Sequence, residues 1–163
     1  MKKGKMRLGE ILIKKGMISQ AQLHDALLAQ KINTGFLGAI LVNKGVLASR
    51  QLAEALSEQF DIPLVDLKSQ YIDAETARKF SSSVILDHKC FPLRQDENCV
   101  TVAMLNPLNA VAIAKVEEEA HPRTVKWILV IEEDMNEAVK NYRQSINQNI
   151  QRLLRKDKTA GNG

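Results

Sequence analysis

A chain of 163 residues that is 45% apolar can bury the core of one ordinary domain or of two small ones. Its longest apolar stretches fall far short of the roughly 20 residues that a membrane helix needs, and no uninterrupted apolar signal segment follows the first lysines. We therefore expect a cytoplasmic globular protein that is not membrane-embedded. Its 2 cysteines and 3 histidines have neither the spacing of a disulfide framework nor that of a zinc site, so we expect no metal.

The net charge of +4 is unevenly distributed along the chain. Residues 1–60 hold nine Lys and Arg against four Asp and Glu, whereas residues 61–163 hold fourteen against fifteen. The excess positive charge therefore belongs to the first sixty residues. It would favour an anionic ligand or an acidic partner surface, although a solvated basic face needs no partner at all.

Those sixty residues contain one 24-residue pattern twice. Arg7–Gln30 aligns with Phe36–Gln59 without a gap, is identical to it at eleven of 24 positions, and is separated from it by the five residues Lys31–Gly35. Repetition at this period indicates stacked supersecondary units.

Each unit is predicted to form a short helix, a turn and a longer helix. The stripe that begins at Leu8 has the helical period, and Gly16 stands where a left-handed residue would end the first helix. Ser19 and Gln22 form a capping-box pattern, which predicts that the second helix begins near residue 20. The second unit matches except at its cap, where Ala48 replaces the serine and we expect the following serine to serve instead.

Three features exceed what helix packing requires. Gly9 and Gly38 lie in the first turn of a helix, where free N–H groups and the positive end of the dipole can meet an anion. Gln30 and Gln59 put an amide on a leucine-lined face, which suits the edge of a base or a peptide group. Arg7 could clamp a phosphate or pair with a guanine. Each also has an ordinary explanation in tight helix crossing, a frayed helix end or a solvated side chain, but their recurrence in two units indicates a bipartite ligand.

The second half changes period and indicates an α+β arrangement of helix, strand, strand, helix, strand and helix. The whole chain is thus predicted to be α+β, with an N-terminal four-helix bundle made of two helix-turn-helix repeats (1–60), a small subdomain with a three-stranded sheet (61–154) and a disordered tail (155–163). The expected elements are a helix capped by Asp73 and ending near Phe80, strands at His88–Arg94 and Cys99–Met104, a helix opened by Asn106-Pro107 and ending near Ala120, a strand at Val125–Ile131, and a helix from Glu132 to about Leu154.

No catalytic residues are predicted. Glu117–Glu119 is interpreted as a solvated helix face and His121-Pro122 as a loop, and no nucleophile lies in a pattern with a base. A phosphate-binding loop of the GxxxxGK[ST] kind is excluded because no glycine lies between Gly45 and Gly161.

The repeat, RLGEILIKKGMISQAQLHDALLAQ followed after five residues by FLGAILVNKGVLASRQLAEALSEQ, resembles the MshEN domain. This is the N-terminal domain of type II secretion and type IV pilus assembly ATPases. Similarity continues through IPLVDL (62–67), CFPLR (90–94), VTVAMLNPLN (100–109) and EEDMNEAVKNY (132–142). The resemblance implies a regulatory domain without catalysis that binds the bacterial second messenger cyclic di-GMP. The contact residues that it implies are Arg7, Leu8, Gly9, Leu12, Leu23, Leu27, Gln30, Leu37, Gly38, Leu41, Leu52, Leu56 and Gln59.

Two positions depart from the family pattern. Phe36 stands where the family prefers Arg or Lys, and losing one charge-assisted hydrogen bond costs about 1.5–3 kcal/mol, or roughly ten- to hundred-fold in affinity, unless Phe36 stacks on the ligand. Asn106 stands where the family often has Asp, which removes a charged partner for Arg7. Phe36 and Asn106 are therefore additional candidate contact residues.

Three functions remain open at this point. The first is the cyclic di-GMP receptor, whose partner would be a secretion or pilus ATPase domain. The second is an adaptor that binds no nucleotide and docks an inner-membrane platform protein, with Phe36 as a contact, which would place the protein at the periphery of that membrane. DNA binding ranks third, and we expect no nucleic acid, because the aromatic residues do not interleave with the basic ones.

Overall fold

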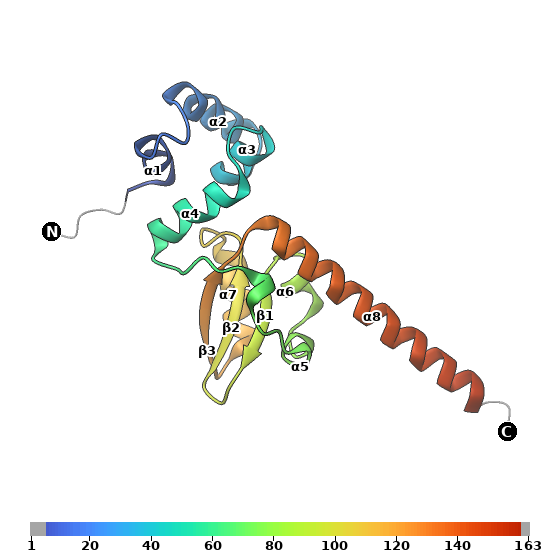
Figure 1. The fold of residues 1–163 in the computed structure, drawn as a ribbon. Helices are drawn as coiled ribbons and strands as arrows, with labels where there is room; N and C mark the ends of the chain where they lie inside the picture. The colour runs from blue at the N-terminus through green and yellow to red at the C-terminus, as the bar shows by residue number, and fades with distance from the viewer. Residues whose placement is uncertain (1–5, 161–163) are drawn as a thin grey trace.

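The structure of the protein is a computed structural model that describes the backbone of residues 6–160 and the side chains of residues 6–158. It consists of four helices followed by a small sheet with flanking helices, and a last helix projects away from both (Figure 1). The predicted α+β class is therefore confirmed. The predicted disorder of residues 161–163 falls outside the described residues.

The repeat forms four helices, as its periodicity predicts. The first helix of one unit packs against the second helix of the other, since α1 contacts α4 and α2 contacts α3. Crossed pairing of this kind lets each unit cover the apolar face that the other leaves open. The helices are α1 (Leu8–Lys14), α2 (Gln20–Ile32), α3 (Leu37–Asn43) and α4 (Ser49–Phe60).

The turns within the units follow their local sequence. Gly16 and Gly45 have φ angles of +67° and +70°, the left-handed conformation that glycine adopts without a steric penalty. The Ser19 hydroxyl accepts from the Gln22 N–H at 3.1 Å, and the Gln22 side chain accepts from the Ser19 N–H at 2.8 Å, so the predicted capping box is confirmed.

The predicted cap of α4 is wrong. Ala48, not Ser49, is the N-cap residue, and the Gln51 side chain accepts from its N–H at 2.9 Å. Ser49 is the first helical residue, and its hydroxyl donates to Glu133 in the last helix. The Ser49 hydroxyl therefore binds the carboxylate of Glu133 and does not cap α4.

The second half contains a three-stranded sheet of order β1-β2-β3. The central strand is antiparallel to β1 and parallel to β3, and it is buried on both faces from Val100 to Met104. Helix α8 packs on β1, and helix α7 packs on β3. The elements are η1 (Leu67–Ser69), α5 (Ala74–Arg78), α6 (Ser82–Leu86), β1 (Phe91–Gln95), β2 (Cys99–Met104), α7 (Ala110–Ala120), β3 (Thr124–Leu129) and α8 (Glu132–Ala160).

Several predictions for the elements of this half need correction. The last strand is Thr124–Leu129 instead of residues 125–131, and the sequence pattern does not predict α6 (Ser82–Leu86). Asn106 does not cap α7: its side chain accepts from the Leu108 N–H at 2.9 Å in a turn, and Asn109 is the cap, accepting from the Ala112 N–H at 3.1 Å. The first strand begins at Phe91 instead of residue 88. Helix α8 continues to Ala160, past the predicted end near residue 154, so residues 155–160 of the predicted tail are helical.

The two halves share one apolar core. The cluster of buried side chains runs from Leu12 and Leu41 in the repeat to Val102 and Leu129 in the sheet. Between the halves, α4 ends at Phe60, and the chain then extends along β3, where the Val65 N–H donates to the Leu129 carbonyl at 2.9 Å. This continuous core fixes the repeat against the sheet.

Candidate functional site

The two predicted glycines lie under leucine side chains of their own units. A Cβ added to Gly9 would lie 2.9 Å from a methyl carbon of Leu23, and one added to Gly38 would lie 2.5 Å from a methyl carbon of Leu52. The missing side chain therefore allows the two helices of each unit to cross closely. Helix packing thus explains why both units have glycine at this position. It also places Leu23 and Leu52 against the first turns of α1 and α3.

The two predicted glutamines make matched contacts between the units. Gln30 Nε2 donates to the Gly35 carbonyl at 2.8 Å, and Gln59 Nε2 donates to the Met6 carbonyl at 3.2 Å. Gly35 and Met6 are themselves matched positions, each one residue before the N-cap of a unit's first helix. The two amides thus bind the backbone just before α3 and just before α1 in the same way. The two units of the bundle are therefore related by an approximate two-fold axis.

The N-caps of α1 and α3 differ in chemical character between the two units. Arg7 is exposed, and its N–H donates to Glu10 at 2.8 Å, while its guanidinium has no hydrogen-bonding partner among residues 6–158. Phe36 occupies the matched N-cap of α3 and is 39% exposed. One unit therefore offers a cation beside its helix start, and the other offers an aromatic ring.

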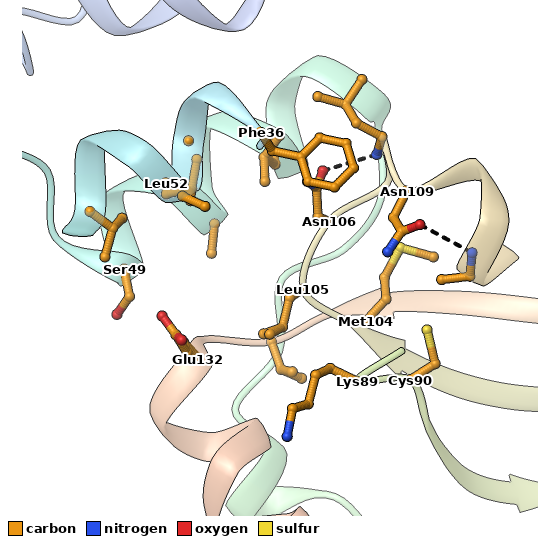
Figure 2. A pocket seen from close by; sticks show the side chains of 18 of the residues that line it. Phe36, Ser49, Leu52, Lys89, Cys90, Met104, Leu105, Asn106, Asn109 and Glu132 are labelled. Atoms are coloured by element: carbon orange, nitrogen blue, oxygen red, sulfur yellow. Dashed lines mark hydrogen bonds between the residues drawn. The ribbon is translucent and has the colours of Figure 1, made fainter. Parts of the chain in front are cut away.

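A cavity of about 300 Å³ lies between the second unit and the α+β half. Figure 2 shows Phe36 and Leu52 on its helical side, with Met104, Asn106 and Asn109 opposite and Ser49 and Glu132 at one end. Apolar atoms supply most of its lining, with a few polar groups among them, which is the usual composition of a small-molecule site. The predicted residues that the structure brings together here are Leu8, Phe36, Gly38, Leu52, Leu56 and Asn106.

The other predicted contact residues do not line this cavity. Leu12 and Leu41 are completely buried in the core, where they support the site without reaching it in this conformation. Leu27 is 42% exposed on α2, away from the cavity. The remaining members of the predicted set that lie outside the cavity lining are Arg7, Gly9, Leu23, Gln30, Leu37 and Gln59.

Polar residues that the sequence did not single out complete the cavity. Lys89 contributes a positive charge to a lining that also holds the carboxylates of Asp87 and Glu132, and its φ of +52° is uncommon for a residue with a Cβ. Asn109 and Ser49 add an amide and a hydroxyl. Asn109 belongs to the VTVAMLNPLN segment, whose similarity to the family is visible in the sequence. No local pattern places residues 87–90 beside this segment, because only the tertiary fold brings their loop to the repeat.

A polar contact joins the two halves beside the cavity. The Ser49 hydroxyl lies 2.8 and 2.6 Å from the two carboxylate oxygens of Glu133, in the first turn of α8. This hydrogen bond is the main cause that lowers the pKa of Glu133 below its ordinary value. An anionic Glu133 is also favoured by its place at the helix N-terminus, so the contact ties the start of α4 to the start of α8 at neutral pH.

Residues 6–158 contain no group of three or more His, Cys, Asp and Glu side chains that could hold a metal ion. Across the same part of the chain, no helix has both the length and the apolar composition to cross a membrane.

Two curated relatives are type IV pilus assembly ATPases named PilB. The Myxococcus xanthus protein is 26% identical over 136 residues, which cover 83% of this chain and 24% of the relative. The Thermus thermophilus protein is 32% identical over 117 residues, which cover 71% of this chain and 13% of the relative. The chain therefore spans a quarter or less of the length of these relatives.

Two solved structures share the fold. A structure of MshE with cdg superposes with a TM-score of 0.73 at 24% identity, covering 84% of this chain and 99% of that chain. The N-terminal domain of XpsE superposes with a TM-score of 0.70 at 18% identity, covering 83% and 93%. The MshEN domain model matches residues 60–149, more than half of the chain, from the end of α4 through most of α8. With the repeat, the sheet and this match in agreement, the chain belongs to the MshEN domain family.

Proposed function

We propose that this chain is a cyclic di-GMP-binding regulatory domain of a type II secretion or type IV pilus assembly ATPase system, without catalytic activity of its own. The observation that carries the proposal is the matched pair of glutamine contacts, Gln30 to Gly35 and Gln59 to Met6, which relates the two units by an approximate two-fold. A two-fold symmetric dinucleotide suits such a frame because its two guanines and two phosphates can meet equivalent groups. The solved structure of MshE with cdg supports this choice of ligand.

In this proposal one half of the ligand occupies the cavity between the second unit and the sheet. The cavity volume of about 300 Å³ is at the low end for ligand sites and suits one half of a dinucleotide, so the other half would lie over the first unit. Leu52 and Leu56 would cover a guanine, and Lys89 would supply positive charge. Arg7 would meet the half that lies over α1.

Two residues that break the two-fold symmetry, Phe36 and Asn106, would change how the second unit contacts the ligand. Phe36 lines the cavity and would stack on the base instead of forming a charged hydrogen bond. Asn106 would offer an amide where a carboxylate would otherwise face the ligand, and its side chain already accepts from the Leu108 N–H. The first unit would therefore contribute the charged contact and the second unit the apolar one.

Titration calorimetry of the purified chain with cyclic di-GMP tests the proposal. We expect binding that Arg7→Ala weakens about tenfold or more, through loss of a charge-assisted hydrogen bond, and that Phe36→Arg strengthens by a similar factor. Lys14→Ala, which removes a cation near the end of α1, is the matched control and should leave the affinity unchanged. Absence of heat at high micromolar ligand in all of these variants would reject the receptor function.

A second candidate, an adaptor that docks an inner-membrane platform protein, is favoured by the apolar outer face of α2. Leu28 and Ile32 lie one helical turn apart and are 46% and 82% exposed. The test is co-sedimentation with the cytoplasmic region of a type II secretion platform protein. The adaptor would be supported over the receptor if the two proteins co-sediment, if Ile32→Ser abolishes this, and if calorimetry with cyclic di-GMP shows no heat.

A further inference from the structure

The second half of α8 carries an exposed apolar stripe. The first half packs on β1, where Tyr142 meets Phe91 edge to face with ring centroids 6.1 Å apart. From residue 143 to residue 158 no side chain is buried, and Figure 1 shows this part of the helix running away from the sheet and the bundle. At a rise of about 1.5 Å per residue, the extension beyond Tyr142 is roughly 27 Å long.

This stripe continues the face by which α8 packs on its own sheet. Successive residues turn by about 100° around a helix, so Ile146, Ile150 and Leu153 fall within roughly 60° of one another and in line with the buried Val139. Ile150, Leu153 and Leu154 are 49%, 63% and 59% exposed, and Leu154 widens the exposed apolar face to roughly 100°. The helix therefore presents a core-type face where the chain supplies nothing to cover it among residues 6–158.

A basic hollow lies at the inner end of the same stripe. It has a volume of about 270 Å³ and is lined by Lys89, Lys140 and Arg143 together with amide side chains. Lys140 and Arg143 sit on the flank of the helix next to the stripe. The outer end of the helix is basic too, since residues 150–160 contain four Lys and Arg against one Asp. An apolar seam with cations at both ends requires an occupant that is apolar along its length and acidic at its edges.

From this arrangement we infer that α8 docks an acidic amphipathic helix of a partner protein, laid along the stripe with its carboxylates toward the hollow and toward Arg152 and Lys158. Neither alternative occupant fits as well. A second copy of the extension would bring two basic segments together, which is repulsive. A membrane-binding helix of this kind would carry aromatic residues on its apolar face, whereas residues 143–160 contain no aromatic residue.

The docked helix would also approach the candidate ligand cavity. Lys89 lines both the basic hollow and the cavity between the halves. A carboxylate of the partner in the hollow and a phosphate in the cavity would therefore compete for an ion pair with Lys89. The docking surface itself is independent of the proposed ligand and stands or falls on its own measurement.

The test uses a synthetic helical peptide of roughly three heptads with Leu at positions a and d and Glu at e and g, and a counterpart with Lys at e and g. Fluorescence anisotropy of the labelled peptide, titrated with the whole chain at low salt, should show that the acidic peptide binds at least about tenfold tighter than the basic one. Ile150→Ser and Leu153→Ser should each weaken binding about tenfold, because each removes a large buried contact. Arg143→Glu should weaken it severalfold, and added salt should do the same.

Two exposed residues elsewhere provide matched controls. Val111→Ser removes a 70% exposed apolar side chain from α7, and Lys126→Glu reverses an exposed charge on β3, so both should leave peptide binding unchanged. Circular dichroism checks that α8 stays helical in every variant. Equal binding of the two peptides, or an acidic complex indifferent to Ile150→Ser, would overturn the inference. Two other results would also overturn it. In one, Ile150→Ser abolishes a dimer seen by sedimentation and leaves peptide binding unchanged; in the other, it abolishes binding to anionic phosphatidylserine vesicles and leaves peptide binding unchanged.

Discussion

Alanine at Gly38 probes how closely the helices of a repeat unit cross. The added Cβ would lie 2.5, 2.9 and 3.3 Å from the Cδ1, Cδ2 and Cγ atoms of Leu52. All three atoms belong to one branched side chain, so the whole isobutyl group must move. At Gly9 the matched distances to Leu23 are 2.9, 3.0 and 3.6 Å, and a shift of a few tenths of an ångström relieves them.

The magnitude follows from two opposing effects. Overpacking of this kind costs about 1–3 kcal/mol, whereas replacing glycine by alanine in a helix gains at most ~1 kcal/mol and less in the first turn. Gly38→Ala should therefore destabilise the protein by about 1–2 kcal/mol. Gly9→Ala, with the smaller overlap, should stay within about 1 kcal/mol of the wild type.

Urea unfolding followed by helical circular dichroism measures both variants. A cycle with Leu52→Ala isolates the contact, because removing the isobutyl group makes room for the new Cβ. The double variant Gly38→Ala/Leu52→Ala should cost no more than Leu52→Ala alone. A Gly38→Ala variant as stable as the wild type, or a double variant that costs the sum of the two single changes, would show that the contact with Leu52 does not cause the loss.

Three further predictions concern polar and titratable groups. Because the pKa of Glu133 is lowered, chiefly by the Ser49 hydroxyl, its stabilising effect is present above the ordinary glutamate value of 4.5 and is lost as the pH falls through the lower folded value. Ser49→Ala should flatten the loss of stability below pH 4.5, and equal acid unfolding curves would contradict this. Burial raises the pKa of Cys90 to about 12, so iodoacetamide should modify the half-buried Cys99 first and Cys90 only on unfolding, as mass spectrometry would show. Asn109→Ala should lower the unfolding free energy in urea by about 1 kcal/mol through loss of the α7 cap, and an unchanged value would count against that role.

Local features of the fold could be predicted because their causes are local. Gly16 and Gly45 end their helices in the left-handed conformation, and the capping box of Ser19 involves groups three residues apart. The sequence pattern predicts the wrong asparagine as the cap of α7, because Asn106 and Asn109 are both residues of a type that caps helices well. Only the structure shows that the first closes a turn and the second begins the helix.

Long-range features could not be predicted from local patterns. The sequence pattern predicts that Gln30 and Gln59 face a ligand, but each donates to a backbone carbonyl ahead of a helix in the other unit. Nothing near Ser49 in the sequence indicated a carboxylate eighty-four residues away. The cavity depends on the same kind of information, since Lys89 reaches it from a loop whose position is set by the sheet.

In the proposed function, the two matched units bind one two-fold symmetric ligand together. Parallel calorimetric titrations of the wild-type chain with cyclic di-GMP and with GMP test it most directly. We expect one cyclic di-GMP per chain and at least roughly hundredfold weaker binding of GMP, because half a ligand engages one unit and forgoes the effective concentration that linkage provides. Equal affinity for the two nucleotides, or two GMP molecules binding as tightly as one cyclic di-GMP, would show that the two units do not bind one ligand together.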